Sequence, residues 1–436
     1  MSRRGRRDAD RRAGVVRHWR AQADGPRAGG DALSRRFLLA AFGDPGHAFP
    51  AIALGAELAR RGHEVTLETW SRWEEHVERE GMRFAAAPEY QVFPTREVPL
   101  KPYAAAVKAS GPTRELIRSF DPELVVADII TVAGSLAAQA EGRPWATLVP
   151  HVLPTGEPGF PIYSIGAVYP RSSIGRRLWA LVRPIVMTGE EQGRVELNVA
   201  RERVGLPALG EVHGGISREL AIVATFPQLE YPRAAGWPGV RVTGPLLWEQ
   251  PFGEVELPPG DAPLVLVAPS TSQDPEHRLV RAALEGLAHE PLRVLATTNR
   301  REPSEPIDVP ANARLVDWVS YARTMPLCDA VVCHAGHGTL ARALASGVPV
   351  VACPHAGDMA ENAARIRWAG AGVSLPRRFM TAQGIRLAVR RLLGEPCYGR
   401  RAEELGDWAT RNDGARAAAD AVEELAESRK KAQRAG

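Results

Sequence analysis

Short apolar runs alternate with amphipathic stretches along most of this chain. The first apolar run, 37–42, ends in a Gly/Pro turn, and apolar residues then recur at helical spacing up to Gly62. Further apolar runs typical of strands lie at 65–69, 124–127 and 146–149 in the first half, and at 264–267, 292–296, 330–333 and 348–352 in the second. Such alternation predicts an α/β fold in which helices cover both faces of parallel sheets.

Two interruptions divide the pattern. Segment 245–262 is rich in Pro and Gly, as a linker would be, so we expect a domain over 37–244 and a second over 263–436, whose last helix packs back on the first domain. Segment 151–209 is irregular and carries aromatic residues before it turns helical. It is predicted to form a binding pocket, and a surface excursion is the alternative.

Composition supports two domains and separates them from a basic leader. The chain has 436 residues, of which 44% are hydrophobic and 24% charged, enough for two cores. The formal charge of +4 comes largely from arginines clustered in residues 1–36, which lack apolar periodicity and are predicted to be a disordered leader. A nucleic-acid-binding tail is the weaker alternative. The rest of the chain is close to neutral.

Neither a membrane span nor a disulfide framework is expected. No stretch reaches the length of about 18 uncharged apolar residues that a spanning helix needs. The apolar run behind Ser34-Arg35-Arg36 ends at Phe42, which is too short for an export signal. The 4 cysteines lie in one half of the chain without CxxC spacing, so neither disulfides nor a zinc site are indicated. The sequence therefore predicts a soluble cytoplasmic protein.

The most informative motif is a glycine-spaced turn behind the apolar run 330–333. It reads His334-Ala335-Gly336-His337-Gly338-Thr339 and leads into a helix-forming stretch. Glycines let a ligand approach the main chain, and the N–H groups and dipole of the first helical turn favour an anion. The imidazole of His334 and the hydroxyl of Thr339 can add donors. This pattern indicates a phosphate site, although a tight strand-to-helix turn would have a similar sequence.

In this motif the chain resembles the family-1 glycosyltransferases, particularly their bacterial natural-product branch, in which a His-x-Gly-x-Gly-Thr turn grips the donor pyrophosphate. The resemblance covers residues 37–426 and is firmest over 315–369 and 43–65. It implies the GT-B fold, with two Rossmann-like parallel-sheet domains facing across a cleft, the first for the acceptor and the second for the nucleotide sugar.

The resemblance also implies further donor-binding residues. Trp318, followed by Val319, stands where the family stacks an aromatic ring on the nucleobase. Asp358 matches an acidic residue that holds sugar hydroxyls, but Met359 replaces the usual Gln, which suggests a deoxysugar with fewer hydroxyls. Ser270 and Thr271 are candidates for pyrophosphate contacts, although the usual glycine is absent from their loop.

In the first half, the family's catalytic base matches His47 within Gly46-His47-Ala48-Phe49-Pro50. An imidazole suits removal of a proton from an acceptor hydroxyl near neutral pH. Asp128 stands where the family provides the carboxylate that orients this base, and a helix N-cap is the alternative role for Asp128. Asp44 is a rival base, three residues before the matching position.

The resulting hypothesis is an inverting, metal-independent glycosyltransferase of antibiotic biosynthesis. It would use a dTDP- or UDP-sugar and a small apolar acceptor, need no cofactor, and have no nucleic-acid partner; a homodimer is one option for its assembly. A nucleotide-sugar epimerase or hydrolase and a non-catalytic nucleotide-sugar-binding protein are the alternatives. A dinucleotide oxidoreductase is disfavoured because Gly43-Asp44-Pro45-Gly46 is not a GxGxxG turn.

Overall fold

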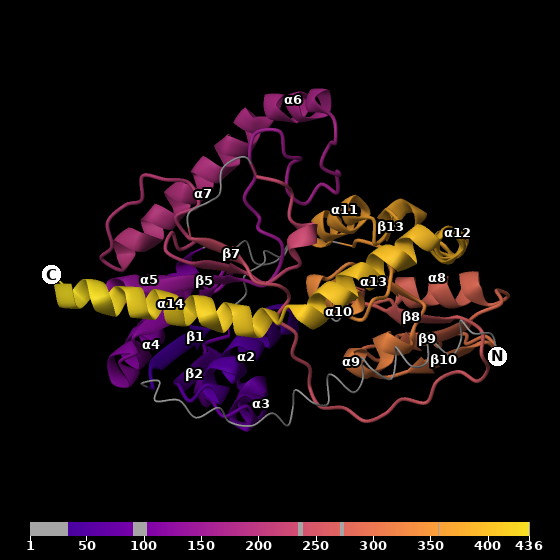
Figure 1. Cartoon of the computed structure of the whole chain (residues 1–436), viewed down its shortest axis with the longest axis horizontal. Coiled ribbons are helices and arrows are strands. Elements are labelled where there is room, and N and C mark those ends of the chain that lie inside the picture. The colour runs from indigo at the N-terminus through magenta and orange to yellow at the C-terminus, as the bar shows by residue number, and fades with distance from the viewer. Residues whose placement is uncertain (1–33, 90–102, 234–238, 271–273, 356, 436) are drawn as a thin grey trace. The chain divides into compact units, whose positions relative to one another are not determined.

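The computed structural model describes residues 34–89, 103–233, 239–270, 274–355 and 357–435. They form two compact units, each built on a parallel sheet (Figure 1). The first unit comprises the described residues of Gly29–Phe160, Pro170–Trp248 and Asn412–Gly436. The second unit comprises those of Pro161–Tyr169 and Glu249–Arg411.

The sheet of the first unit has the strand order β3-β2-β1-β4-β5-β6-β7, and neighbouring strands pair in parallel. Its strands are β1 (Arg36–Ala40), β2 (Glu64–Thr69), β3 (Arg83–Ala86), β4 (Leu124–Asp128), β5 (Trp145–Val149), β6 (Ala221–Val223) and β7 (Val240–Val242). The chain builds the sheet outward from β1 to β3 and then crosses to β4 on the other side. The strand order therefore reverses between β1 and β4.

Helices cover both faces of this sheet because the buried side chains of β1 alternate. Phe37 and Leu39 join a core with α2 (Pro45–Arg60) and α14 (Gly414–Ala435), whereas Leu38 packs with α4 (Ala104–Phe120) and α5 (Val132–Ala140). The remaining helices of the unit are α3 (Glu74–Arg79), α6 (Ser173–Leu181) and α7 (Arg183–Arg203), with short 3-10 turns at Ser71–Trp73 and Pro227–Leu229.

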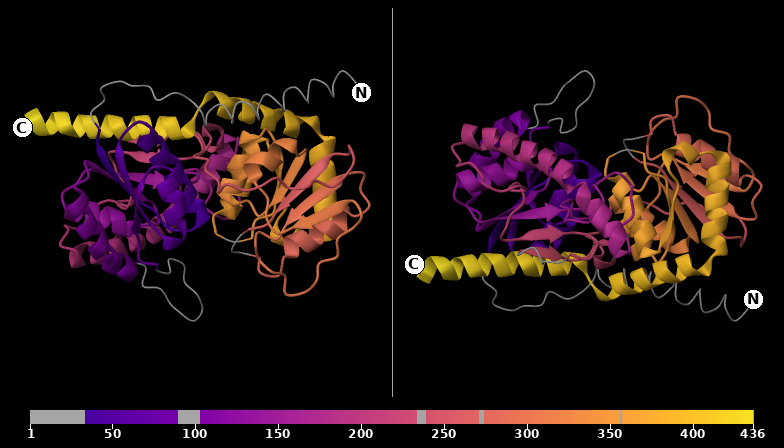
Figure 2. Two further views of the ribbon diagram at one scale, coloured as in Figure 1. Left: turned by 90° about the horizontal axis from the view of Figure 1, so that it is seen from below. Right: turned by 90° about the horizontal axis from the view of Figure 1, so that it is seen from above.

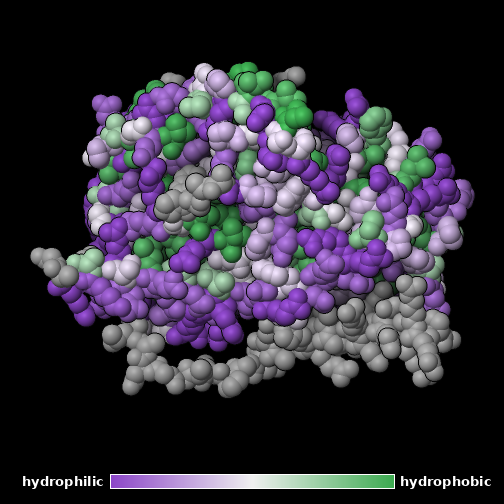
Figure 3. Space-filling model, turned by 45° about the horizontal axis from the view of Figure 1, so that its top comes forward, coloured by the Kyte–Doolittle hydropathy of each residue, from purple (hydrophilic) through white to green (hydrophobic). Residues whose placement is uncertain are grey.

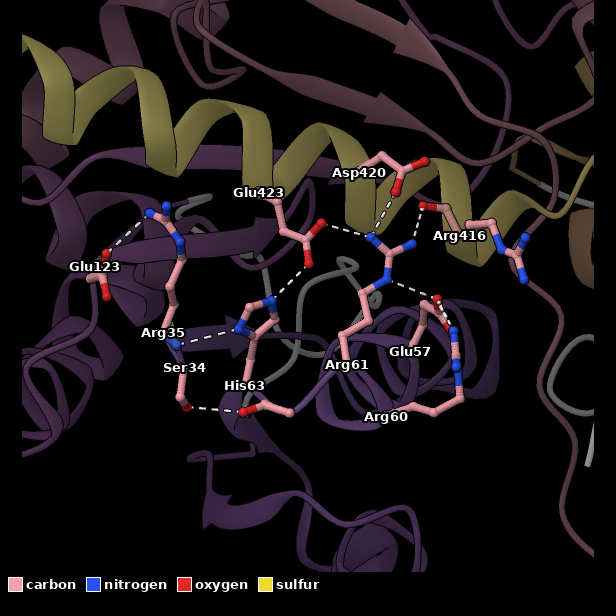
Figure 4. A network of polar contacts seen from close by, with 11 residues as sticks. Ser34, Arg35, Glu57, Arg60, Arg61, His63, Glu123, Arg416, Asp420 and Glu423 are labelled. Atoms are coloured by element: carbon pink, nitrogen blue, oxygen red, sulfur yellow. Dashed lines mark hydrogen bonds and ion pairs between the residues drawn. The ribbon is translucent and has the colours of Figure 1, made fainter. Parts of the chain in front are cut away.

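The C-terminal helix α14 runs along the first unit, as Figures 1 and 2 show, and a polar network fastens it there (Figure 4). Arg61, at the end of α2, donates to Asp420 at 2.6 Å and to Glu423 at 2.7 Å. Glu423 also lies 2.7 Å from Nε2 of His63, whose Nδ1 accepts the main-chain N–H of Arg35 at 3.3 Å. These contacts join three segments that are far apart in the sequence.

The sheet of the second unit has the order β10-β9-β8-β11-β12-β13, again with parallel neighbours. Its strands are β8 (Leu264–Ala268), β9 (Arg293–Thr297), β10 (Ala313–Val316), β11 (Ala330–Cys333), β12 (Val350–Ala352) and β13 (Gly372–Ser374). Its helices are α8 (Arg278–Leu287), α9 (Tyr321–Thr324), α10 (His337–Ala345), α11 (Met359–Ala369), α12 (Ala382–Gly394) and α13 (Pro396–Arg411), with 3-10 turns at Met325–Leu327 and Arg377–Phe379. Here the order reverses between β8 and β11.

The expected α/β class and parallel sheets are confirmed, and several boundaries differ from the sequence prediction. The predicted leader ended at Arg36, but β1 begins there, and Ser34 already donates to the carbonyl of Gly62 at 2.9 Å; residues 1–33 lie outside the described part. The boundary between the two units lies between Trp248 and Glu249, within the expected linker. Pro161–Tyr169 belongs to the second unit rather than to the first.

Candidate active site

Both sheets place candidate residues at the point where their strand order reverses. His47 follows β1 and Asp128 ends β4, the two strands that flank the reversal in the first sheet. Ser270 follows β8 and His334 follows β11, which flank the reversal in the second. Ligands of open parallel sheets bind beyond the carboxyl ends of such strands. Each unit therefore has its predicted residues at the position that its topology favours for a ligand.

In the first unit, the structure brings His47 and Asp128 into contact. Nδ1 of His47 lies 2.8 Å from Oδ1 of Asp128, whose side chain is fully buried. A carboxylate can only accept, so Nδ1–H of His47 donates and the neutral ring carries no proton on Nε2. The other oxygen of Asp128 accepts the main-chain N–H of Phe42 and the hydroxyl of Thr131, both at 3.4 Å. This arrangement fixes the imidazole and keeps Nε2 basic.

Packing holds the loop that carries His47. A Cβ atom at Gly43 would lie 2.0 Å from Cγ of Trp70, so a larger residue does not fit there. The carbonyl of Gly43 accepts Nε1–H of Trp73 at 2.7 Å. The main-chain carbonyl of Asp44 starts helix α2, whereas its carboxylate lies 3.5 Å from Arg72. Of the two predicted bases, His47 is therefore the one placed on Asp128.

In the second unit, Ser270 and His334 meet through a hydrogen bond. The main-chain N–H of Ser270 donates to Nδ1 of His334 at 2.8 Å, so the ring proton of neutral His334 sits on Nε2. Burial lowers the pKa of His334 to about 4, although the carboxylate of Asp274 opposes the shift, with Oδ2 3.5 Å from Nε2. His334 is thus neutral at pH 7, and its buried Nε2–H has no hydrogen-bond partner among the described residues.

The glycines of the predicted phosphate turn face open space. A Cβ atom at Gly336 or at Gly338 would meet nothing within 4 Å, and neither glycine has a positive φ. The protein's own packing and backbone therefore do not require glycine here, which is consistent with space kept for a ligand. Gly336 is the N-cap of α10, and Thr339 lies in its first turn, half-buried. The N–H groups of this turn point their partial positive charge at that space.

Trp318 follows β10 at the same edge of the second sheet. The guanidinium of Arg300 lies over its indole ring, 4.5 Å from the centroid, so one face of Trp318 is covered. A nucleobase would stack on the opposite face or replace the guanidinium. Val319 was also predicted to bind the donor, but the residue as a whole is 1% exposed. The main chain of Val319 is therefore buried as well as its side chain.

The predicted sugar-binding residues lie at the start of α11. Asp358 is the N-cap of this helix, and its Oδ2 accepts Nδ2–H of Asn362 at 3.1 Å. The same Nδ2 donates to the carbonyl of Ala335 in the phosphate turn at 3.0 Å, which joins the two motifs. The side chain of Met359 is 9% exposed, so it offers a small apolar surface. Thr271 lies outside the described residues.

Three residues of this region escaped the sequence prediction. Asp274 accepts two main-chain N–H groups at the start of α8, from Arg278 and Leu279, and faces His334. Arg300 covers Trp318 from the loop behind β9. Glu249 accepts the N–H groups of Tyr321 at 2.6 Å and Ala322 at 2.9 Å, which holds the segment directly behind Trp318. None of them lies in a recognisable sequence motif. Each contacts a part of the site that is distant in the sequence, namely His334, Trp318 or Tyr321.

Two family descriptions match the chain, one in each half. The glycosyltransferase family 28 N-terminal domain matches residues 37–144, and the erythromycin biosynthesis protein CIII-like, C-terminal domain matches residues 281–425. The first match contains His47 and Asp128, and the second contains Trp318, His334 and Met359. Among the described residues, no helix is long and apolar enough to cross a membrane.

Curated relatives cover nearly the whole chain. The 4'-demethylrebeccamycin synthase of Lentzea aerocolonigenes is 29% identical over 431 residues, which are 90% of this chain and 100% of that protein. The O-mycaminosyltylonolide 6-deoxyallosyltransferase of Streptomyces fradiae is 29% identical over 432 residues, which are 90% of this chain and 98% of that protein.

Solved structures share the fold. The glycosyltransferase of kitacinnamycin superimposes with a TM-score of 0.73 at 20% identity, covering 90% of this chain and 100% of the other. The calicheamicin glycosyltransferase CalG4 gives a TM-score of 0.71 at 24% identity, covering 90% and 98%. With both family matches, the full-length relatives and the shared fold in agreement, the chain is a glycosyltransferase of the GT-B fold, similar to the family-1 enzymes of the bacterial natural-product branch.

Proposed function

We propose that this glycosyltransferase moves a sugar from a dTDP- or UDP-sugar, with inversion, to a hydroxyl group of a small apolar acceptor such as a natural-product aglycone. The observation that carries the proposal is the 2.8 Å contact between His47 and the buried carboxylate of Asp128. A histidine held by a buried carboxylate serves best as a base for a hydroxyl proton.

In the proposed reaction, Nε2 of His47 takes the acceptor's hydroxyl proton as the oxygen attacks the anomeric carbon. The bond from this carbon to the diphosphate breaks on the opposite side, and the nucleoside diphosphate leaves with the bonding electrons. A single displacement of this kind inverts the anomeric centre. Asp128 stabilises the imidazolium that forms and holds the ring in position.

The phosphate turn of the second unit supplies the donors that the leaving group needs. The main-chain N–H groups and dipole of α10, together with the neutral Nε2–H of His334 and the hydroxyl of Thr339, would stabilise the developing charge. Because dipoles and N–H groups can supply this stabilisation, the proposed mechanism needs neither a metal ion nor a cofactor.

The nature of the donor is supported by relatives and by Met359. Two similar solved structures, VinC and SsfS6, are described as complexes with dTDP and thymidine diphosphate. Relatives include a 6-deoxyallosyltransferase and a rhodosaminyltransferase, as well as UDP-glucosyltransferases. Met359 cannot hydrogen bond a sugar hydroxyl as the Gln expected in the family would. We infer a deoxysugar donor from this replacement.

Nucleotide binding tests the donor site separately from catalysis. Thermal unfolding is measured with UDP, dTDP and GDP, each at a hundredfold excess over its dissociation constant, where binding adds about 2.7 kcal/mol of stability. Stabilisation by dTDP or UDP, and its loss in Trp318→Ala, supports the proposal. If none of the three nucleotides shifts the transition, the donor-site assignment is wrong. Met359→Gln then tests the sugar: an unchanged ratio of hexose to deoxyhexose transfer contradicts the deoxysugar inference.

A further inference from the structure

Helices α6 and α7 present an apolar stripe to solvent. The side chains of Ile174, Leu178, Leu181 and Ile185 are 69%, 62%, 76% and 70% exposed, and their spacing of four, three and four residues puts them on successive turns. None of the residues of α6 is buried. Figure 3 shows apolar surface at the top of the molecule, where Figure 1 has α6. We call these four residues the α6–α7 stripe.

Helix α7 exposes three further large apolar side chains. Met187, Val195 and Val199 are also among the large apolar side chains that are exposed, and the last two lie one helical turn apart. A folded protein exposes single apolar side chains freely, but a contiguous row over several turns marks an interaction surface. The row spans a pair of helices rather than a loop, so it offers a rigid face.

Charge divides the same two helices into opposite halves. Residues 171–183 include Arg171, Arg176, Arg177 and Arg183 and no acidic residue, whereas residues 186–199 include Glu190, Glu191 and Glu196 with Arg194 as their single basic residue. Arg183 and Glu190 pair with each other at 2.9 Å, and Glu191 pairs with Arg194. Arg171 and Arg177 are exposed and make no ion pair within the described part of the chain.

We propose that the α6–α7 stripe is the interface with a second copy of this chain, in which α6 and α7 of the two copies lie antiparallel. A two-fold axis near Ile185 sets the basic half of each copy against the acidic half of the other and covers both stripes. The face is thus complementary to itself in charge as well as in hydrophobicity. The inference rests on the exposed side chains and charges of α6 and α7, so it does not depend on the proposed function.

An anionic membrane fits this face less well. A lipid surface would attract the arginines of α6, but it would repel the glutamates that border the apolar side chains of α7. The charge changes from basic on α6 to acidic on α7, which favours a partner whose charge changes from acidic to basic along the same direction. A second copy in antiparallel orientation has this charge pattern.

The oligomeric state tests the proposal directly. Sedimentation velocity of the full chain, over a wide concentration range, should show a dimer at twice the chain mass of 47.2 kDa. Leu181→Glu should raise the dimer dissociation constant by about tenfold or more, because a charge replaces a central apolar contact. Leu387→Glu on α12 is the matched control, since Leu387 is also an exposed leucine, at 53%. A wild-type chain that stays monomeric at the highest concentration overturns the proposal.

A charge-reversal pair tests the antiparallel arrangement itself. Arg171→Glu with Arg177→Glu makes both halves acidic, and Glu191→Arg with Glu196→Arg makes both halves basic. Each double variant alone should be mainly monomeric, whereas an equal mixture of the two should form the heterodimer. If the mixture stays monomeric, or either variant dimerises as the wild type does, the interface lies elsewhere. Binding of a monomeric wild type to vesicles of anionic phospholipid would also overturn the proposal in favour of a membrane.

Discussion

The main-chain N–H of Ser270 donates to Nδ1 of His334 across 2.8 Å, which joins the two strands at which the order of the second sheet reverses. His47 and Asp128 hold the equivalent place in the first sheet, with Nδ1 and Oδ1 also 2.8 Å apart. The two contacts have opposite effects on their imidazoles. Asp128 leaves Nε2 of the neutral His47 ring without a proton, whereas Ser270 makes Nε2–H of His334 a donor. The proposed deprotonation of a hydroxyl group and the proposed binding of a diphosphate need these two states.

Asp128→Asn should lower the rate of sugar transfer about a hundredfold or more, because the amide can present its NH2 group to the ring and no longer stabilises an imidazolium. His47→Ala should lower the rate of sugar transfer by at least the same factor. The measurement is the turnover rate at saturating donor and acceptor. The affinity for the nucleoside diphosphate should be unchanged in both variants, since the phosphate turn lies in the other unit. Retention of the full rate in Asp128→Asn would exclude the pair as the catalytic unit.

Gly338→Ala should separate ligand binding from folding. Its Cβ atom would meet no protein atom within 4 Å, so the free energy of unfolding should stay the same or rise by up to about 1 kcal/mol. A bound diphosphate would collide with the same methyl group, and the dissociation constant should rise about tenfold, for a cost of about 1.4 kcal/mol. Calorimetry and thermal unfolding measure the two quantities. Gly111→Ala, also in open space but on α4, is the control and should leave nucleotide affinity unchanged.

Glu68 should make the protein less stable as the pH rises through neutrality. Burial raises the pKa of this carboxyl to about 7, although a hydrogen bond from Thr113 opposes the shift. The folded state therefore binds a proton that the unfolded chain loses near pH 4.5, so this stability is complete below pH 4.5 and is lost as the pH rises through 7. The loss amounts to about 3 kcal/mol at most.

The matched variant is Glu68→Gln, which cannot ionise. Denaturant unfolding from pH 4.5 to pH 8 should show the variant gaining stability relative to the wild type as the pH rises. Thr113→Val, which removes the opposing hydrogen bond and a 3.3 Å contact with the carbonyl of Ala109, should retain the pH dependence. Parallel curves for wild type and Glu68→Gln would show that Glu68 does not titrate in this range.

Arg61→Met should loosen α14. The substitution removes the hydrogen bonds to Asp420, to Glu423 and to the carbonyl of Arg416, and leaves Glu423 with His63 alone, which should cost about 1–3 kcal/mol. Hydrogen exchange should increase in the first half of α14. Arg60→Met is the control, because Arg60 pairs with Glu57 of its own helix, and should change stability by about 0.5 kcal/mol or less. Equal exchange in the two variants would mean that apolar packing alone holds α14.

The sequence predicted the sheets where periodicity was strong. The buried strands with apolar runs were predicted. The three-residue strands β6, β7 and β13 were missed because so few residues carry no clear pattern, and β3 and β10 were missed because their side chains are partly exposed. Nothing in the sequence indicated that Pro161–Tyr169 belongs to the second unit while the residues on either side belong to the first. This segment is held by tertiary contacts, such as that of the Ser164 N–H with Glu361 at 3.3 Å.

The candidate residues were predicted by motif, and their partners were not. His47, Asp128 and His334 lie where the motif resemblance expected them, at the carboxyl ends of strands. Asp274, Arg300 and Glu249 were missed because their contacts join segments that are distant in the sequence. A motif also does not tell how exposed its residues are, since the place of Val319 in a motif gave no sign that this residue is buried.

Sugar transfer by this chain is expected to depend on His47. The most direct measurement incubates the wild type and His47→Ala with dTDP- and UDP-sugars and a panel of aromatic and macrolide aglycones, and detects glycosides by mass spectrometry. We expect a glycoside with the wild type, its loss in His47→Ala, and equal nucleotide affinity in the two proteins. Equal product from both proteins, or consumption of the nucleotide sugar without any dependence on an aglycone, would contradict this expectation.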